Sequence, residues 1–412
     1  MSATSPGVRD RRDQQVRHER RRAVRALLAS PLLHADRDLE AFRLVRRHTD
    51  WLRRWFAHEA GWTLTVDTTL ARLRKVPATV DDGTRPARAR RSDPPFSRRR
   101  YVLLCLALAS LETADRQVAL GRLAELIVSS VAADPDLAAA GIAFELDTRD
   151  QRRDLVAVVR LLLELGILQH VDGADSDYVA GTGDALYTID RSALSAVLAA
   201  RRPPSSIDAD DLDDRLAAVT AEVVPDTVDG RNRATRTHLT RRLLDDPVVY
   251  VDDLDDDQRA YLSSQRARLL AAVGEATGLE PEVRAEGIAM VDDRGDVTDL
   301  EVPDQGTDGH LTLLVAEELA GRLRRDPHVI VTTGEVEAKV ADLVAVHGHH
   351  WRRDVRDAGA ETRLAAEVVE RLAAVALVRI VEGGVAPRPA IARYAVAAPT
   401  LPPAPAPSLF EA

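Results

Sequence analysis

The fold class is decided by residues 147–190, which read DTRDQRRDLVAVVRLLLELGILQHVDGADSDYVAGTGDALYTID. Aliphatic residues recur there at the spacing of one helix face: Leu155, Val158, Val159, Leu162 and Leu165. Asp147 or Thr148 can cap this helix, and Gly166 ends it. Strands are expected at Ile167–Val171 and Ala185–Asp190, with a polar loop from Asp172 to Asp184 between them. Helices are also expected before it, from Ser97 to Leu111 and from about Val118 to Ala132. Helices followed by a two-stranded hairpin are typical of a winged helix-turn-helix.

A similar order of elements returns near the C-terminus. Thr333 can cap a helix through about Val346, and a second helix is expected from about Glu361 to Ala376. Strands are expected at Leu377–Val381 and Ile391–Val396. A shift of 210 residues aligns Val158 with Val368, Leu162 with Leu372 and Ile167 with Leu377. Tyr187 then aligns with Tyr394 if the loop before the last strand is three residues shorter. We therefore predict two winged-helix domains, at residues 96–200 and 333–398, in a mainly α protein with small β-hairpins (α+β).

The segments outside these two domains are less regular. Residues 1–15 are expected to be a disordered arm, and residues 16–95 a basic region of helices and one hairpin. In that region we predict a helix from Val16 to Ala29, a helix from Asp36 or Asp38 to about His58, and a hairpin of Thr63–Val66 with Leu70–Lys75. Residues 79–95 are rich in Asp, Arg, Pro and Gly, which predicts a mobile loop.

The middle and the end of the chain complete this division. Residues 201–207 are predicted to be a linker, residues 208–332 a connecting helical region with short strands, and residues 399–412 a Pro-rich disordered tail. Helices are expected in the connecting region at Asp211–Val223, Asn232–Asp245 and Asp255–Thr277. Short strands are expected there at Val248–Val251, Glu282–Val291 and Val297–Val302.

Composition indicates a helical protein that works in the cytoplasm. Only 4% of the 412 residues are aromatic, so the cores must consist mainly of Ala, Leu and Val. The longest apolar run, Tyr101–Ala109, is too short to cross a bilayer. The N-terminus has no apolar signal segment, and the single cysteine, Cys105, excludes an internal disulfide framework. A cytoplasmic location without membrane attachment is therefore expected.

The charge is distributed unevenly along the chain. The first 100 residues hold 24 Arg and Lys against 12 Asp and Glu, whereas the rest holds 32 against 54. Nearly all basic residues are arginines, which can reflect the codon bias of a GC-rich genome, but such bias does not explain the change of sign. A basic end on an acidic body favours contact with a polyanion or an acidic partner.

Catalytic motifs are absent from the sequence. Neither lysine follows a glycine, which excludes a P-loop, and HExxH, GxSxG and paired CxxC motifs are missing. His347, His349 and His350 cluster, but their place near a helix end is favourable without any ligand. The set Asp304, Glu337 and Lys339 superficially matches a nuclease pattern, yet Glu337 and Lys339 fall within one predicted helix. We predict no catalytic residue, no metal site and no cofactor.

Basic clusters are the only positive site signals. Arg72, Arg74 and Lys75 lie on the predicted hairpin, where alternation puts Arg72 and Arg74 on one face. Further arginines begin two predicted helices: Arg98, Arg99, Arg100, Arg152 and Arg153. Arginine at a helix start opposes the helix dipole, so its presence there favours a function. These residues are candidates for sequence-independent contacts with DNA phosphates, and a solvated arginine-rich surface is the alternative.

Several segments of the first 115 residues resemble a known family. They are FRLVRRH (42–48), WLRRWF (51–56), GWTL (61–64), ARLRKVP (71–77) and FSRRRYVLLCLALA (96–109). Together they resemble the MukE-like subunit of type II Wadjet anti-plasmid systems, an actinobacterial family encoded beside an SMC-type ATPase, a kleisin-like protein and a toprim nuclease. The resemblance implies a kleisin-interacting tandem winged-helix protein that dimerises and helps the SMC motor to hold DNA, while the partner chains supply the ATPase and nuclease activities.

Three functions remain open from the sequence. The first is a non-catalytic, kleisin-binding, DNA-contacting subunit of an SMC-type complex that acts against plasmid DNA, most simply as a homodimer. The second is a free-standing winged-helix transcriptional regulator, although such regulators are usually shorter and bind palindromes as dimers. The third is a nuclease or another defence enzyme. Gene neighbourhood and co-purification with neighbouring gene products distinguish the first two, and a metal-dependent cleavage assay tests the third.

Overall fold

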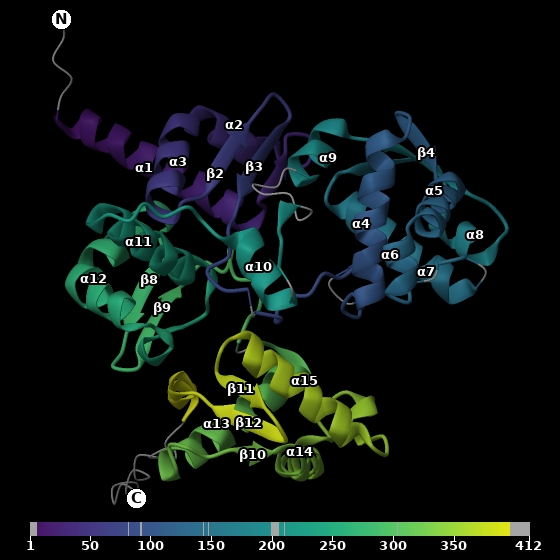
Figure 1. The fold of residues 1–412 in the computed structure, drawn as a ribbon. Helices are drawn as coiled ribbons and strands as arrows, with labels where there is room; N and C mark the ends of the chain where they lie inside the picture. The colour runs from purple at the N-terminus through teal and green to yellow at the C-terminus, as the bar shows by residue number, and fades with distance from the viewer. Residues whose placement is uncertain are drawn as a thin grey trace, which may run out of the picture. The chain divides into compact units, whose positions relative to one another are not determined.

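The computed structural model describes residues 6–80, 82–90, 93–142, 144–146, 148–198, 206–209, 211–302 and 304–395. It divides into two compact units, of which the first comprises residues 1–244, 256–280 and 292–297 and the second comprises the remainder. Small antiparallel sheets of three strands alternate with helices along the whole chain (Figure 1). Within the described residues, no helix is both long and apolar enough to cross a membrane.

The first module is built around the hairpin that the sequence predicts. Its elements in chain order are α1 (Pro6–Ala29), β1 (Leu32–His34), α2 (Leu39–Arg47), α3 (Thr49–Trp55) with a π-helical turn at Phe56–Ala60, β2 (Thr63–Val66) and β3 (Leu70–Arg74). The sheet order is β1-β3-β2. Asp38 caps α2, because its carboxylate accepts a hydrogen bond from the Ala41 amide at 2.9 Å. Phe42, Phe56 and Trp62 are fully buried in the core between the helices and the sheet.

Two expectations for the first hundred residues are corrected, and strand β1 was not expected. The first helix begins at Pro6, so residues 6–15 are helical and not a disordered arm. Strand β1 lacks an alternating pattern because all three of its residues are buried. The described residues of 79–95 contain no helix or strand, but they are not simply a mobile loop: Ala89 is buried, and the Ala87 amide donates a hydrogen bond to the Tyr101 hydroxyl at 2.8 Å.

The second module contains the residues that decide the fold class. Its elements are α4 (Arg98–Thr113), β4 (Gln117–Ala119), α5 (Leu120–Ala133), α6 (Pro135–Ala139), α7 (Arg149–Glu164), β5 (Leu168–Gly173), α8 (Asp175–Ala180), β6 (Ala185–Ile189) and α9 (Arg191–Leu198). Thr148 caps α7, and the sheet order is β4-β6-β5. The predicted polar loop at 172–184 is wrong in part, because α8 lies within it and Asp175 accepts a hydrogen bond from the buried Tyr187 at 2.6 Å. Strand β4 and helix α9 were not expected.

The connecting region also contains a sheet. Its elements are α10 (Leu212–Thr220), α11 (Val228–Asp245), β7 (Val249–Tyr250), a 3-10 turn at Val251–Asp253, α12 (Asp256–Thr277), β8 (Glu280–Val283) and β9 (Gly287–Val291), with sheet order β7-β9-β8. The three predicted helices are confirmed. The predicted strand at Val297–Val302 is wrong, because these residues form turns and the Val297 amide donates to Asp292 at 3.0 Å. Most of the expected linker and the Pro-rich tail lie outside the described residues.

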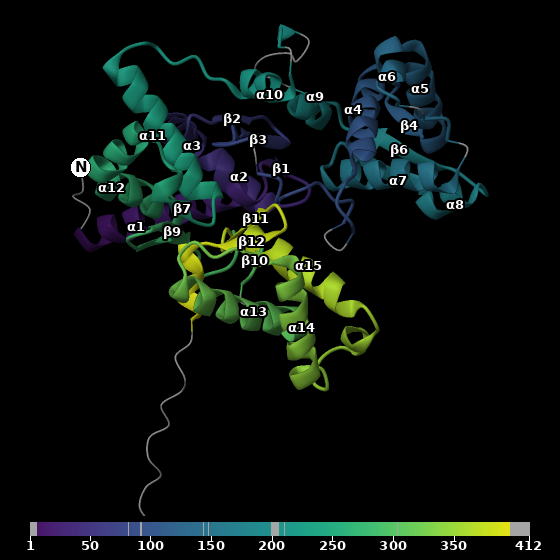
Figure 2. The same ribbon diagram turned by 60° about the horizontal axis from the view of Figure 1, so that its bottom comes forward.

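The last module repeats the arrangement. Its elements are α13 (Gly306–Arg325), β10 (Val331–Thr332), α14 (Thr333–His347), a 3-10 turn at Arg353–Arg356, α15 (Ala360–Ala374), β11 (Val378–Val381), β12 (Gly384–Pro387) and a 3-10 helix at Pro389–Tyr394. Figure 2 shows α13, α14 and α15 beside the β10-β12-β11 sheet. The predicted strand at 391–396 is wrong: β12 follows β11 after a two-residue turn, and Pro389 then begins the 3-10 helix. The twenty-residue helix α13 was missed.

The sheets share one topology. In each, the strand that is last in sequence lies between the other two, and a helix precedes the first strand. The internal repeat is clearest between α7-β5 and α15-β11, where Leu162 and Leu372 are both fully buried. The backbone repeats too, because Gly166 and Ala376 both follow these helices in the left-handed region, with φ of 71° and 56°. The pairing of Tyr187 with Tyr394 fails, because Tyr394 ends a 3-10 helix and does not lie in a strand.

Candidate nucleic-acid interface

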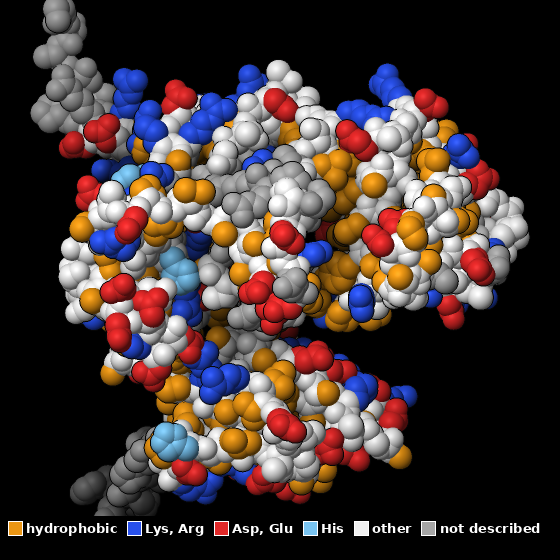
Figure 3. All heavy atoms as spheres, in the orientation of Figure 1, with side chains coloured by type: hydrophobic (Ala, Val, Ile, Leu, Met, Phe, Trp, Pro, Cys, Tyr) orange, Lys and Arg blue, Asp and Glu red, His pale blue; other side chains and the backbone are white. Residues whose placement is uncertain are grey.

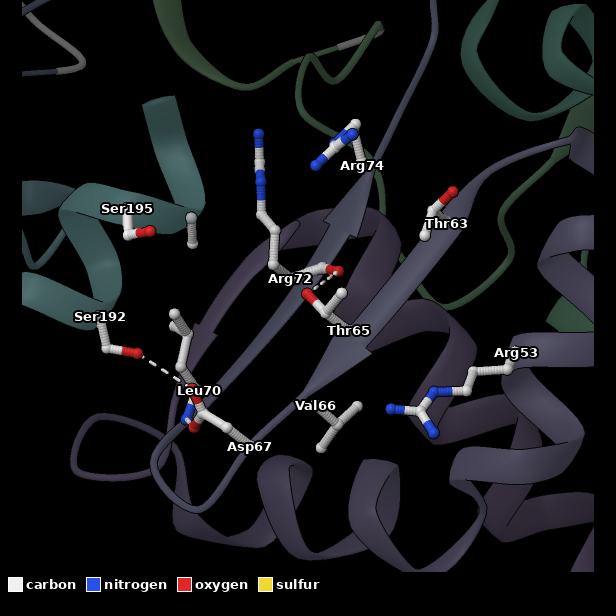
Figure 4. Close-up of a pocket in the computed structure, with 11 residues that line it drawn as sticks. Arg53, Thr63, Thr65, Val66, Asp67, Leu70, Arg72, Arg74, Ser192 and Ser195 are labelled. Atoms are coloured by element: carbon white, nitrogen blue, oxygen red, sulfur yellow. Dashed lines mark hydrogen bonds between the residues drawn. The ribbon is translucent and has the colours of Figure 1, made fainter. Parts of the chain in front are cut away.

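A hollow of about 530 Å³ lies over the outer face of the first sheet, within the first unit (Figure 4). We call it the arginine hollow. It is lined by residues of α3, β2, β3 and α9: Arg53, Thr63, Thr65, Val66, Asp67, Leu70, Arg72, Arg74, Ser192, Ser195 and Ala196. Helix α9 follows the second module, so a segment more than a hundred residues away along the chain closes the hollow over the hairpin.

The hairpin aims its two arginines into the arginine hollow. Strand register pairs Thr65 with Arg72 and Thr63 with Arg74, and Leu73 between the arginines is fully buried on the opposite face. The predicted placement of Arg72 and Arg74 on one face of the strand is therefore confirmed. Figure 4 shows both side chains rising from β3 on the same side. The alternation of buried and outward residues thus sets the geometry of the site.

The turn of the hairpin is held by Asp67. Its carboxylate accepts hydrogen bonds from the amides of Thr69 and Leu70, both at 2.7 Å, and from the Ser192 hydroxyl at 2.9 Å. Burial raises the pKa of Asp67, but these hydrogen bonds outweigh burial and hold the pKa below its ordinary value. Asp67 is therefore an ionised acceptor whose oxygens are occupied, and it also ties α9 to the hairpin.

The guanidinium groups of Arg72 and Arg74 have no hydrogen-bond or ion-pair partner among the described residues. Both side chains are half-buried, and the Nε atom of Arg72 is fully buried and unpaired. Burial, and then the charge of Arg74, lower the pKa of Arg72. Two like charges in a partly desolvated hollow repel each other, so an anion between them would be stabilised. Arginine forks beside threonine and serine hydroxyls suit the oxygens of a phosphate.

The other predicted residues lie in different surroundings. Lys75 is placed over the Trp62 ring, with Nζ 5.0 Å from its centroid. Arg99 and Arg100 both approach Asp154 of α7, at 3.7 and 2.8 Å. The contacts with Asp154 neutralise part of the positive charge at the start of α4, which agrees with the alternative of a solvated arginine-rich surface.

The remaining three candidates differ from one another. Arg153 pairs with the exposed Asp150 of its own helix at 2.8 Å. Arg98 is exposed. Arg152 is half-buried, and its Nε atom is buried without a hydrogen-bond partner. The structure therefore brings Arg72 and Arg74 together without carboxylate partners, whereas Arg99, Arg100 and Arg153 are engaged with Asp154 or Asp150.

A second basic hollow of about 390 Å³ lies along α7. Four arginines line it, two of which the sequence had not marked: Arg100, Arg149, Arg153 and Arg160. Arg160 is engaged with Asp175 at 3.2 Å, and Asp93 also lines this hollow. It therefore carries a smaller unpaired charge than the arginine hollow. Figure 3 shows further basic side chains on the exposed face of the first module's helices, and the sequence identifies these as arginines.

The histidines and the lysine that the sequence offered as metal-site or nuclease candidates pack against neighbouring side chains. His347 lies near His310 and Trp351, whose indole donates a hydrogen bond to His310 at 3.2 Å. The rings of His349 and His350 are close but tilted, with centroids 3.8 Å apart and planes at 44°. In the described ranges no three His, Cys, Asp or Glu side chains are grouped as metal ligands. Lys339 pairs with Glu318 of α13 at 3.4 Å.

Sequence reasoning missed three polar groups of the arginine hollow. Arg53 donates a hydrogen bond to the Leu64 carbonyl at 3.2 Å, and its position in a predicted helix gave no reason to join it to the hairpin. Ser192 and Ser195 lie on α9, which was not predicted. No local pattern could have placed them there, because tertiary packing brings α9 to the hairpin.

The chain belongs to the family described as a protein of unknown function (DUF2398), whose model matches residues 24–397. Comparison with curated proteins gave no significant match, and comparison with solved structures gave none either.

Proposed function

We propose that this chain is a non-catalytic, DNA-contacting and kleisin-binding subunit of an SMC-type complex that acts against plasmid DNA. The observation that carries the DNA part is the pair of unpartnered guanidinium groups, Arg72 and Arg74, in a hollow with hydroxyl groups. Contacts of this kind bind the phosphates of DNA of any sequence, which suits a non-catalytic subunit of a complex that must hold DNA at every position.

We further propose that the modules are winged helices. Support comes from their topology: a helix and a strand are followed by one to three α-helices and then by two strands, with the short helix α8 between those two strands in the second module. The first and third strands are adjacent in every sheet. In such folds a two-stranded wing and the helices beside it commonly contact the DNA backbone or another protein chain. The arginine hollow lies on the hairpin of the first module, which corresponds to its wing.

The proposed partners rest on the resemblance of residues 42–109 to MukE-like subunits of type II Wadjet systems. They are a kleisin-like subunit, an SMC-like ATPase and a toprim nuclease, with a second copy of this chain as a homodimer. The one titratable carboxylate that lines the arginine hollow, Asp67, is occupied by hydrogen bonds, which favours binding over catalysis at this site. A cytoplasmic location follows from this assignment.

A free-standing transcriptional regulator is the alternative. A regulator reads base edges through side chains in the major groove, and it therefore discriminates strongly between DNA sequences. Among the described residues that line the hollow are arginines and hydroxyls but no Asn or Gln, the side chains that read adenine. Arginine can also read guanine, so a comparison of DNA sequences decides between the two functions. Equal affinity for unrelated duplexes supports the proposal, and a strong preference for one palindrome supports the regulator.

A plasmid-retention assay tests the proposed function. Cells carrying this gene with its neighbours should lose a test plasmid, and the double variant Arg72→Gln/Arg74→Gln should retain it. The matched control Arg43→Gln/Arg122→Gln removes the same charge from exposed positions outside the hollow and should still clear the plasmid. Plasmid clearance by the Arg72/Arg74 variant at the wild-type rate would contradict the proposed role of the hollow.

A further inference from the structure

A larger groove of about 1040 Å³ lies elsewhere in the first unit, between α3, α11 and α12. We call it the aromatic groove. Its lining combines rings and arginines: Trp51, Trp55 and Tyr261 with Arg54, Arg233 and Arg268. None of these residues belongs to the arginine hollow. The rings come from α3 and α12, and the arginines from all three helices.

The charges of the aromatic groove are incompletely balanced. Among the described residues Arg54, Arg233 and Arg268 have no hydrogen-bond or ion-pair partner, and all three are exposed. A fourth arginine, Arg236, is engaged, because it donates a hydrogen bond to the His58 carbonyl at 2.9 Å and lies 3.9 Å from Glu59. Two carboxylates, Glu59 and Asp229, line the groove against four arginines, so the excess of positive charge favours an anionic ligand.

The rings already form a stack. Trp51 and Trp55 are nearly parallel, at 17°, with centroids 6.3 Å apart, and the guanidinium of Arg20 lies 4.8 Å from the Trp51 centroid. Trp51, Trp55 and Tyr261 are only half-buried, whereas Trp62 and Trp351 are buried. Partly exposed planar rings beside unpaired guanidinium groups suit a ligand that is both planar and anionic.

We propose that the aromatic groove binds single-stranded nucleic acid. Its bases would stack on the exposed rings while Arg54, Arg233 and Arg268 contact the phosphates, the combination that binds single strands without sequence preference. A duplex fits less well, because its bases are stacked on one another and cannot reach rings inside a groove. The site is separate from the duplex contacts proposed for the arginine hollow, so either proposal can fail alone.

Intrinsic tryptophan fluorescence of the full chain tests this inference. A thymidine oligonucleotide of about 20 nucleotides should quench the fluorescence, because two of the four tryptophans line the groove and the other two are buried. Duplex DNA of the same length should quench it much less. Binding of the oligonucleotide without quenching would overturn the proposal, as would stronger quenching by a polyglutamate peptide.

Paired variants separate groove contacts from general charge. Arg233→Gln/Arg268→Gln should reduce the slope of log affinity against log salt by about 1.4, at about 0.7 per phosphate contact. Raising salt from about 50 to about 200 mM should then weaken wild-type binding about sevenfold more than that of the variant. The control Arg231→Gln/Arg266→Gln lies on the same two helices, is also exposed and does not line the groove. Equal slopes for the two variants would overturn the assignment.

A third variant tests the stacking contact. Tyr261→Leu keeps an apolar side chain and a good helix former at this position of α12 but removes the aromatic face. Oligonucleotide affinity should fall at least about fivefold, because stacking on one ring contributes about 1–3 kcal/mol per base. Thermal unfolding of the variant should match that of the wild type. Unchanged affinity in the folded variant would contradict base stacking in the groove.

Discussion

The double variant Arg72→Gln/Arg74→Gln should bind duplex DNA more weakly than the wild type, and its affinity should depend less steeply on salt concentration. The two guanidinium groups have no hydrogen-bond or ion-pair partner among the described residues, whereas Arg53 is held by the Leu64 carbonyl, so we assign one phosphate contact to each of Arg72 and Arg74. Each contact contributes about 0.9 to the slope of log affinity against log salt, and the variant should therefore lose about 1.8. Between about 50 and about 200 mM salt, wild-type affinity should fall about twelvefold more than that of the variant.

Fluorescence anisotropy with two unrelated duplexes measures this slope. The loss should be the same for both sequences, since phosphate contacts carry no base information. The control Arg43→Gln/Arg122→Gln should keep the wild-type slope. The variant should also remain as stable as the wild type, because the charge of Arg74 and burial already lower the pKa of Arg72. An unchanged slope for Arg72→Gln/Arg74→Gln would refute the reasoning. So would a larger decrease of the slope for Arg99→Gln/Arg100→Gln, because the side chains of Arg99 and Arg100 approach Asp154.

Further predictions concern stability. Arg25→Ala should lower the free energy of unfolding by about 3–5 kcal/mol in a denaturant titration, because it removes the buried arginine that pairs with the buried carboxylate of Asp292. The double variant Arg25→Met/Asp292→Asn should recover much of this. Glu19 has its pKa lowered from 4.5 to about 2, chiefly by the His48 hydrogen bond, so its contribution is present above pH 4.5 and disappears as pH falls through 2. Glu19→Gln should therefore lower Tm at pH 7 but not near pH 2. Ala376→Gly should raise stability by about 0.5–1 kcal/mol, because Ala376 has φ of 56°; a lower Tm would contradict this.

Many of the regular helices were predictable because a capping residue or an apolar stripe marks them locally, whereas α8, α9 and α13 were missed. Helix α7 has both a capping residue, Thr148, and an apolar stripe, and its predicted bounds are nearly those observed. Strands β1, β4, β7 and β10 have only two or three residues each, too few to show alternation. They form because they pair with the last strand of each sheet, which is a tertiary effect.

The errors near the C-terminus have a local cause. The sequence Ile391–Val396 alternates like a strand, but Pro389 favours the start of a helix and a 3-10 helix forms there. The pair Glu382-Gly383 indicates the observed hairpin, because glycine favours a tight turn. In the structure Gly383 has φ of 79°, and the pair forms a two-residue turn between β11 and β12. Gly384 and Pro387 made β12 look unlike a strand.

The candidate site was predictable only in part. Alternation on the hairpin correctly placed Arg72 and Arg74 together, since this is a property of a single strand. The neutralisation of Arg99 and Arg100 by Asp154 depends on the packing of α4 against α7 and could not be read from spacing. The same holds for Ser192, which reaches Asp67 across 125 residues.

The mass of the complex formed on co-expression with the proposed kleisin-like partner tests the central claim most directly. Light scattering after size exclusion should give one species that contains the kleisin-like chain and about two copies of this 45.0 kDa protein. A 45.0 kDa monomer that elutes apart from the kleisin-like chain would contradict the account.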